Sequence, residues 1–290
     1  MFRQKTGSVV CASCGSLVGV NDDKCYSCGR RNPGLWGFGP VLRRFGNDFG
    51  FTTVIIYGCA ALYTLSLILT VISGGNVMSG SFFTMLGPNR FAAVALGESG
   101  AIPVFAAGRW WTVLSAGWLH GGLLHVAMNM YWVWQMGPSI VEFFGPSRTV
   151  IIYTMGGIAG FALSSVAGAY FPALPLLGGG GRGLTVGASA PVFGLIGALY
   201  HYGRTTSSAV KQMAMSIMLQ AAVFGVVMSG LNIDNYAHIG GFIGGYLTAT
   251  VFGPMTKERG DHVIIALGCL VASALAIVAS IVTGLPYLRP

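Results

Sequence analysis

Charged side chains are scarce in this sequence. Asp, Glu, Lys and Arg together make up 8% of the 290 residues, against about 25% in soluble globular domains. Apolar residues reach 53%, and glycine occurs 45 times. Such a chain cannot cover a soluble surface with charge, and its many glycines would let helices approach each other closely in a membrane. The composition therefore excludes an ordinary soluble domain and predicts an all-α polytopic membrane protein.

Two patterns typical of other functions are also missing. No H-E-x-x-H pattern occurs, which a zinc metalloprotease in the membrane would need. No internal repeat is visible, whereas a transporter built from broken helices is expected to show one. The net charge of +8 could indicate nucleic-acid binding, but the basic residues are placed as membrane topology requires, so no nucleic-acid partner is expected.

Long apolar runs predict seven membrane spans. The runs cover about 54–73, 119–137, 150–170, 188–202, 212–229, 235–252 and 263–283. The fourth is short, which fits a helix that begins below the membrane surface inside a cavity. Residues 74–112 are too irregular for a span and too apolar for a solvated linker, so we expect a structured loop half-sunk in the outer leaflet.

The basic residues predict the orientation. Twelve Lys and Arg fall on the side of the N-terminus, Arg43, Arg44 and Lys257 among them, and four fall on the other side: Arg90, Arg109, Arg182 and Arg289. Basic residues are in excess on the cytoplasmic side of membrane proteins. The N-terminus is therefore expected in the cytoplasm and the C-terminus outside, in a multi-pass protein of a bacterial inner membrane that contacts lipid.

Four cysteines near the N-terminus predict a metal site. Cys11 and Cys14 form one C-x-x-C pair, Cys25 and Cys28 form another, and a glycine follows each pair. Four thiolates suit a tetrahedral structural Zn²⁺, and glycine allows the turn that points amides at sulfur. Two disulfides or a redox C-x-x-C are the alternatives, but nothing in the sequence supplies the oxidising setting they need. This zinc-ribbon-like module would be structural or would bind a partner that the sequence does not identify.

The chain therefore divides into four predicted parts. The zinc-ribbon-like module covers 1–32, and a juxtamembrane linker covers 33–51. Six of the predicted spans fall within 52–255, and the seventh, with a tail, falls within 256–290.

Polar residues in three apolar segments predict a catalytic site. Ser189 stands among small residues at the start of the fourth span, and His238 stands near the start of the sixth. Both spans run inward, so the two side chains can share one depth below the outer surface. Histidine is the usual base for a serine nucleophile. His125 and Asn129 are four residues apart on one helix face, and their N–H groups could stabilise an oxyanion.

Small residues predict that these two spans pack closely. Gly241 and Gly245 follow His238 along one stripe of the sixth span, and Gly194 and Gly197 thin the fourth. Such stripes let helix backbones approach each other, which Ser189 and His238 need in order to meet.

These motifs together resemble the rhomboid family of intramembrane serine proteases. The matching elements are His120-x4-His125-x3-Asn129, Gly187-Ala188-Ser189-Ala190 and Ala237-His238-x2-Gly241-x3-Gly245. The resemblance covers roughly 52–255. It implies a rhomboid-like six-helix core with one added C-terminal helix, and a Ser189–His238 dyad without a third acidic member.

The resemblance also implies roles for further residues. His125, Asn129 and the backbone N–H of Ser189 match the family's oxyanion site, His120 matches a structural histidine, and Glu142 falls where the family often has a glutamate. The implied activity is hydrolysis of peptide bonds in transmembrane protein substrates near the outer membrane face, with no cofactor for catalysis. A catalytically inactive rhomboid-like adaptor would be expected to lack the serine or the histidine, and both are present.

Two positions depart from the family pattern. The family usually has Trp-Arg ahead of the second span, whereas Thr112 follows Trp111 here. That arginine braces the first loop, so we expect a different brace, with Arg109 as the candidate. Ala190 stands where the family often has glycine after the serine, and this smallest of changes is expected to leave activity intact.

Overall fold

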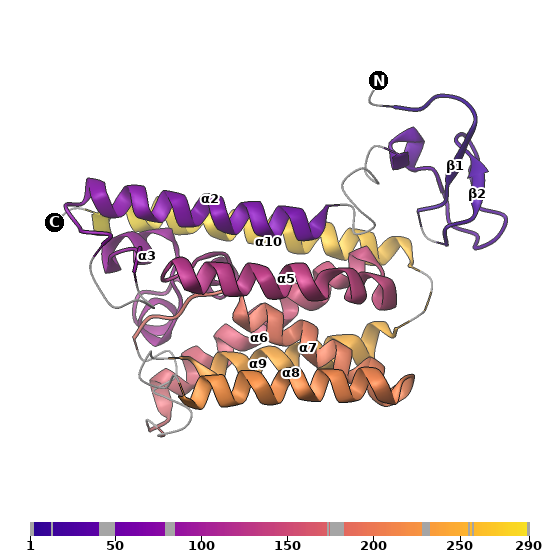
Figure 1. Ribbon diagram of the computed structural model, residues 1–290. Helices are drawn as coiled ribbons and strands as arrows, with labels where there is room; N and C mark the ends of the chain where they lie inside the picture. Colours follow the sequence, from indigo (N-terminus) through magenta and orange to yellow (C-terminus); the bar gives the residue numbers. More distant parts are fainter. Residues whose placement is uncertain are drawn as a thin grey trace.

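The computed structural model describes residues 3–12, 14–40, 50–78, 85–172, 174, 183–227, 233–254, 256 and 258–288. Five basic residues counted for the topology lie outside these ranges: Arg43, Arg44, Arg182, Lys257 and Arg289. Figure 1 shows a bundle of nearly parallel and antiparallel helices with a small N-terminal module beyond one end. The C-terminus lies at the opposite end of the bundle, as an odd number of crossings requires.

Seven long helices form the bundle within the described residues, which agrees with the seven predicted spans. They are α2 (Phe51–Ile72), α5 (Leu123–Phe144), α6 (Pro146–Tyr170), α7 (Ser189–Thr205), α8 (Ser208–Val227), α9 (Asn235–Phe252) and α10 (Gly260–Gly284). The bounds of α9 match the prediction. The predicted end of the second span at residue 137 was wrong, because α5 continues through Pro138 to Phe144. Proline usually interrupts a helix, and here it does not.

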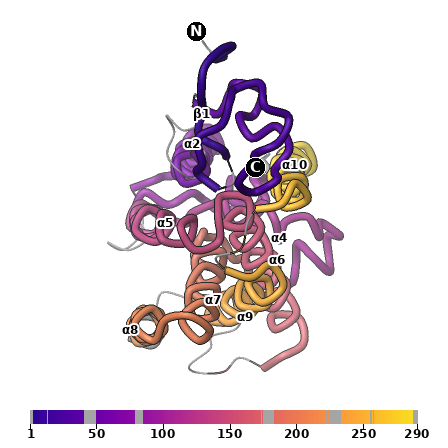
Figure 2. Tube along the Cα trace, turned by 90° about the vertical axis from the view of Figure 1, so that its right-hand side faces the viewer, coloured from indigo at the N-terminus to yellow at the C-terminus, as the bar shows by residue number. Residues whose placement is uncertain are grey.

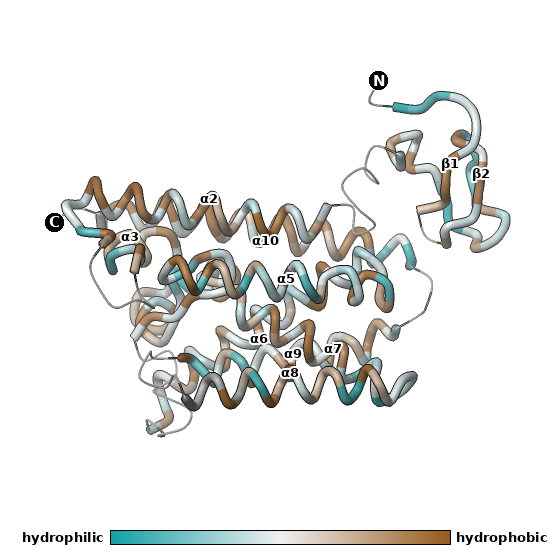
Figure 3. Tube along the Cα trace, viewed as in Figure 1, coloured by the Kyte–Doolittle hydropathy of each residue, from teal (hydrophilic) through white to brown (hydrophobic). Residues whose placement is uncertain are grey.

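Among the described residues, helices α2, α6 and α10 are long and apolar enough, by length and composition, to cross a membrane. Their environments differ: 67% of the most apolar stretch of α6 is buried, against 28% for α2 and 22% for α10. Helix α6 is therefore a core helix, whereas α2 and α10 expose most of their apolar residues. Figure 3 shows apolar residues along most of α2, and bands of polar residues on α5 and α8 as well as in the N-terminal module.

The segment between α2 and α5 is built of short helical pieces, in keeping with the predicted irregular loop. We call its described part, residues 85–122, loop 1. It contains α3 (Arg90–Leu96), the π-helix η2 (Ile102–Ala106), α4 (Thr112–Ser115) and the 3₁₀-helix η3 (Ala116–Trp118). The side chain of Asn89 caps α3 by accepting the N–H of Ala92, and Gly97 ends it in a left-handed conformation.

Glycine allows α7 and α9 to pack backbone against backbone. A Cβ atom on Gly245 would lie 2.0 Å from the carbonyl oxygen of Gly194, and one on Gly241 would lie 2.2 Å from that of Ala190. Helix α6 joins the same contact, because a Cβ on Gly156 would lie 2.8 Å from the Cα of Gly194. Figure 2, viewed along the bundle, shows α6, α7 and α9 grouped together and α8 at the edge. The predicted stripe on the sixth span therefore is a helix interface.

The N-terminal module is a hairpin with two cysteine turns. Strands β1 (Ser8–Val10) and β2 (Leu17–Gly19) pair antiparallel, with Val9 opposite Val18. A 3₁₀-helix, η1 (Leu35–Gly37), follows the second cysteine pair. The only other 3₁₀-helix of the described chain outside loop 1 is η6 (Leu285–Leu288), which continues α10.

Candidate active site

Ser189 is the first residue of α7, and the chain that leads to it is extended. Thr185 pairs with Ser99 of loop 1. The N–H of Ser99 donates to the carbonyl oxygen of Thr185 at 3.1 Å, and the N–H of Thr185 donates to the carbonyl oxygen of Ser99 at 2.8 Å. The N–H of Gly187 then donates to the carbonyl oxygen of Ala116 at 3.0 Å. Gly187 has a φ of +132°, which L side chains rarely adopt. Loop 1 therefore positions the residues that precede the serine.

His238 reaches Ser189 from the neighbouring helix. It lies in the first turn of α9, and its Nε2 atom is 3.1 Å from the Ser189 hydroxyl oxygen. The ring of Phe193 stacks on the imidazole, with centroids 4.3 Å apart and planes 6° from parallel. Among the described residues, no carboxylate is hydrogen-bonded to this imidazole. The imidazole is thus in contact with the Phe193 ring on one side and with the Ser189 hydroxyl at Nε2.

His125 faces the same space from α5. Its Nδ1 accepts the N–H of Gly121 at 3.3 Å, so the neutral ring carries its proton on Nε2. A Cβ atom on Gly187 would lie 2.6 Å from that Nε2 and 3.5 Å from the Ser189 hydroxyl oxygen. Glycine at 187 therefore leaves open a space that both the serine oxygen and a histidine donor border.

His120 supports the backbone beneath the serine. Its Nε2 accepts the N–H of Ala188 at 3.4 Å, and its ring meets that of His125 edge to face, with centroids 5.1 Å apart. The residue is 2% exposed, and its Nδ1 has no hydrogen-bond partner within the described chain. This position fits the structural role that the resemblance implied.

Asn129 lies one turn below His125 on the same face of α5 and is 5% exposed. Its side-chain N–H₂ donates to the carbonyl oxygen of His125 at 3.0 Å. The structure thus brings Ser189, His238 and His125 around one space, whereas the Asn129 amide bonds within its own helix. Glu142, near the end of α5, is exposed.

A cavity of about 260 Å³ adjoins the site on the side of loop 1. Glu98, His120 and Val186 are among the residues that line it. Burial raises the pKa of Glu98 to about 8, against the opposing effect of the Arg90 charge. Burial therefore favours the neutral form of the Glu98 carboxyl in this cavity.

Sequence reasoning did not identify Phe193 as a site residue. It follows Ser189 by four residues on α7, and residues at that spacing share a helix face. This four-residue spacing was the signal in the sequence that could have placed Phe193 beside Ser189. Sequence reasoning did name Arg109 as the substitute brace of loop 1, and the structure shows its side chain 4% exposed and hydrogen-bonded to α3 and α10.

The four N-terminal cysteines form a second cluster, far from Ser189 in the sequence. Their sulfur atoms all lie within 4.8 Å of one another, with Cys11–Cys28 at 3.8 Å and Cys14–Cys25 at 3.6 Å, and no pair is disulfide-bonded. A tetrahedral zinc with bonds of about 2.3 Å places its sulfur ligands roughly 3.8 Å apart. Gly15 and Gly29 have φ values of +76° and +74°, as the predicted turns require. The cluster could hold a metal ion.

The fold and the site define a class: an integral membrane protein of packed helices with a serine and a histidine in hydrogen-bond contact near one end of the bundle. Comparison with known proteins assigns the family. The Rhomboid domain model matches residues 107–255, just over half of the 290 residues. The chain belongs to the rhomboid family.

Curated relatives agree with this assignment. The chain is 30% identical over 212 residues to "Rhomboid protease GluP" of Bacillus subtilis, covering 71% of this chain and 36% of that protein. It is 32% identical over 172 residues to "RHOMBOID-like protein 4" of Arabidopsis thaliana, covering 58% and 40%. "RHOMBOID-like protein 7" of the same plant is 28% identical over 211 residues, covering 68% and 63%. The matches thus span between about a third and two thirds of these relatives.

Proposed function

We propose that this protein is an intramembrane serine endopeptidase that hydrolyses peptide bonds with a Ser189–His238 dyad. The observation that carries the proposal is the 3.1 Å separation between the Ser189 oxygen and His238 Nε2, on two helices that glycine lets pack closely. Family membership and a relative named as a protease support the same conclusion.

In the proposed reaction, the Ser189 oxygen attacks the carbonyl carbon of the scissile bond while its proton passes to His238 Nε2. The histidine then gives this proton to the leaving amine as the C–N bond breaks, which leaves an acyl-enzyme ester on Ser189. Water next attacks the ester carbon, its proton passes to Nε2, and the proton returns to the serine oxygen as the acid product leaves. Stacking on Phe193 keeps the imidazole oriented through both steps.

The negative charge that develops on the carbonyl oxygen needs donors that are already in place. We propose that the backbone N–H of Ser189 and the Nε2–H of His125 donate to it in the space beside Gly187. The proximity of that space to both the Ser189 oxygen and His125 Nε2 supports this assignment. Asn129 has a second amide hydrogen besides the one given to His125 and would complete the site.

The substrates we propose are transmembrane proteins, cut near the outer face of a bacterial inner membrane. The basic residues described at the end of the bundle nearest the N-terminal module include Arg148, Arg204, Lys211 and Arg259, which supports a cytoplasmic N-terminus. Ser189 and His238 belong to the opposite, outer end. The proposed chemistry uses side chains, the backbone N–H of Ser189 and water, so no cofactor takes part in it.

We also propose that Cys11, Cys14, Cys25 and Cys28 hold one structural Zn²⁺ in the module of residues 1–32. The close sulfur atoms and the two glycine turns support this choice. A fold with two three-residue strands has little core of its own, so a metal would supply most of its stability. The proposed division places the linker at 33–51, the core at 52–255 and the added helix at 256–290.

A cleavage assay with a membrane-spanning reporter substrate tests the proposed activity. Ser189→Ala and His238→Ala should each abolish cleavage, and the double variant should resemble either single one because such losses do not add. Ser165→Ala is the matched control, since within the described chain the hydroxyl of this buried serine donates to the carbonyl oxygen of Phe161 in its own helix. Cleavage that persists in Ser189→Ala would exclude the proposed mechanism.

A further inference from the structure

Helix α10 lies outside the matched family domain, yet its last turn is bonded to loop 1. The guanidinium of Arg109 donates to the carbonyl oxygen of Ser280 at 2.8 Å and to the Thr283 hydroxyl at 3.2 Å. The same guanidinium donates to the carbonyl oxygen of Val94, in α3, at 2.8 Å. One buried side chain therefore joins α10 to two parts of loop 1.

Two small residues of α10 make the contact close. The hydroxyl oxygens of Ser280 and Ser115 are 3.1 Å apart, and Ser115 donates to the carbonyl oxygen of Gly97 at 2.9 Å. A Cβ atom on Gly284 would lie 2.2 Å from the carbonyl oxygen of Ala95. The helix thus touches the backbone of loop 1 at the end of α3, where no side chain would fit between them.

The contact of α10 with loop 1 is connected to Ser189 through a series of hydrogen bonds. Gly97 is two residues before Ser99, whose backbone pairs with Thr185. Ser99 also accepts the Thr112 hydroxyl at 3.2 Å, and Thr112 stands where the family usually has arginine. Thr185 and Gly187 then fix the extended approach to Ser189.

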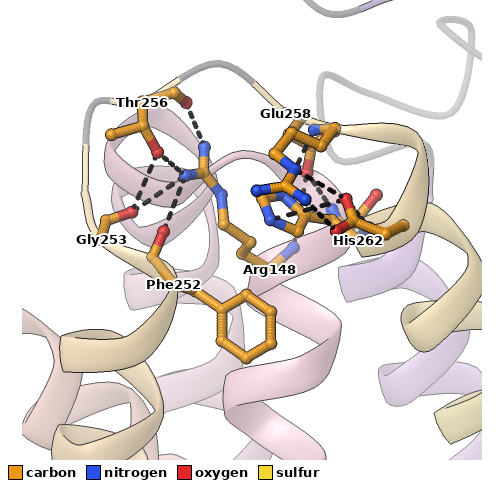
Figure 4. Close-up of polar contacts among 9 residues, drawn as sticks. Arg148, Phe252, Gly253, Thr256, Glu258 and His262 are labelled. Atoms are coloured by element: carbon orange, nitrogen blue, oxygen red, sulfur yellow. Dashed lines mark hydrogen bonds and ion pairs between the residues drawn. The ribbon is translucent and has the colours of Figure 1, made fainter.

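The opposite end of α10 is fixed as well (Figure 4). Arg148, 2% exposed at the start of α6, donates to the carbonyl oxygen of Gly253 at 2.9 Å and to Thr256, in the connection from α9. The Glu258 carboxylate accepts the N–H of Ser147 at 2.6 Å at the N-terminus of α6, where negative charge is favourable. The connection that leads into α10 is therefore bonded to the start of α6, while the last turn of α10 is bonded to loop 1.

We infer that α10 is a positioning element for the active site: its last turn holds loop 1, and loop 1 holds residues 185–188 so that Ser189 faces His238. The inference rests on the proposed function for its effect on catalysis. Ser280, Gly284 and Arg109 are positioning residues and do not touch the reacting atoms.

Two glycines of α10 form a matched pair for the test. Gly284→Ala places a methyl group against the backbone of Ala95, whereas Gly268→Ala, on the same helix, meets nothing within 4 Å. Both changes replace helical glycine by alanine, so their effects on helix propensity are similar. Misplacement of reacting groups by about 1 Å can cost on the order of 100-fold in rate.

Three measurements on each purified full-length variant decide the inference. We expect Gly284→Ala to lower kcat by about 10- to 100-fold with little change in KM, and to speed hydrogen exchange at the amides of Ser99, Thr185 and Gly187. Gly268→Ala should match the wild type in turnover and in hydrogen exchange. A lower Tm for Gly284→Ala, with normal turnover per folded molecule and unchanged exchange, would mean that α10 only stabilises the fold and would overturn the inference.

A milder pair keeps the test decisive if Gly284→Ala does not fold. Ser280→Ala removes the bond to Ser115 without adding volume, and Ser273→Ala removes a buried hydroxyl two turns earlier in the same helix. Faster exchange at Ser99 and Thr185 in Ser280→Ala alone supports the inference, and equal exchange in the two variants contradicts it. If the wild type cleaves nothing, the proposed function fails, and the exchange data still decide whether α10 holds loop 1.

Discussion

Asn129 is the site residue whose observed contact differs most from its expected one. Its amide donates to the carbonyl oxygen of His125 in its own helix, so only its second hydrogen is available to an oxyanion. We predict that Asn129→Ala lowers kcat by about 10- to 100-fold. Loss of one oxyanion donor lowers kcat by about 10²- to 10³-fold in other enzymes, so the expected effect lies at or below the low end of that range. KM and Tm should change little. Turnover and thermal unfolding are measured on the same purified variant, and a lower Tm with normal turnover per folded molecule would assign Asn129 to structure alone.

Phe193 provides a second test on the scale of one residue. Its ring lies parallel to that of His238, and a pair of stacked rings contributes about 0.5–1.5 kcal/mol. Phe193→Leu should therefore lower kcat by roughly 2- to 10-fold, because the imidazole is no longer held in one plane. Phe193→Tyr keeps the ring and should stay close to the wild type. Equal kcat values for the leucine and tyrosine variants would show that stacking does not orient the base.

On the scale of helices, the glycine contact between α7 and α9 sets the distance between serine and histidine. Gly245 has no room for a methyl group, since its Cβ would lie 2.0 Å from the backbone of α7. We predict that Gly245→Ala separates the two helices, lowers the free energy of unfolding by about 1–3 kcal/mol and reduces cleavage. Thermal unfolding and reporter cleavage are the measurements, with Gly268→Ala as the control. A Gly245→Ala protein with the stability and cleavage rate of that control would contradict the packing account.

The helices, and the proximity of Ser189 to His238, could be predicted because their signals are local. Apolar runs indicated seven helices, and the small residues around Ser189 and after His238 indicated where two of them meet. The end of α5 was missed because Gly137 and Pro138 look like a helix terminus, although α5 continues past them. The contact of α10 with loop 1 depends on which helices are neighbours, and residues 109 and 280 are too far apart in the chain for spacing to indicate it.

On the scale of the whole molecule, the N-terminal module and the helical bundle should have separable properties. We predict one Zn²⁺ per chain by elemental analysis of purified protein, because four sulfur atoms lie at distances that suit a tetrahedral ion. Cys25→Ser should lose the metal, whereas Cys269→Ser, in α10, should keep it. Absence of zinc from the wild type, or an equal zinc content in the two variants, would exclude this metal site.

Removal of the module tests its independence from catalysis. Deletion of residues 1–45 should leave reporter cleavage in detergent close to that of the full chain, since the contacts of Ser189, His238 and His125 described above are with one another, with the bundle or with loop 1. Loss of cleavage in a deleted protein with an unchanged Tm would show that the module takes part in activity.

Mass spectrometry after reaction with a fluorophosphonate, a reagent that modifies activated serine hydroxyls, tests the central claim most directly. The account predicts one covalent adduct, mapped to Ser189, because His238 Nε2 lies 3.1 Å from that oxygen and can take its proton. His238→Ala should lose the adduct while keeping its Tm, and Ser165→Ala should keep it. An adduct on another serine, or one that forms equally in His238→Ala, would contradict the assignment of Ser189 and His238 as the catalytic pair.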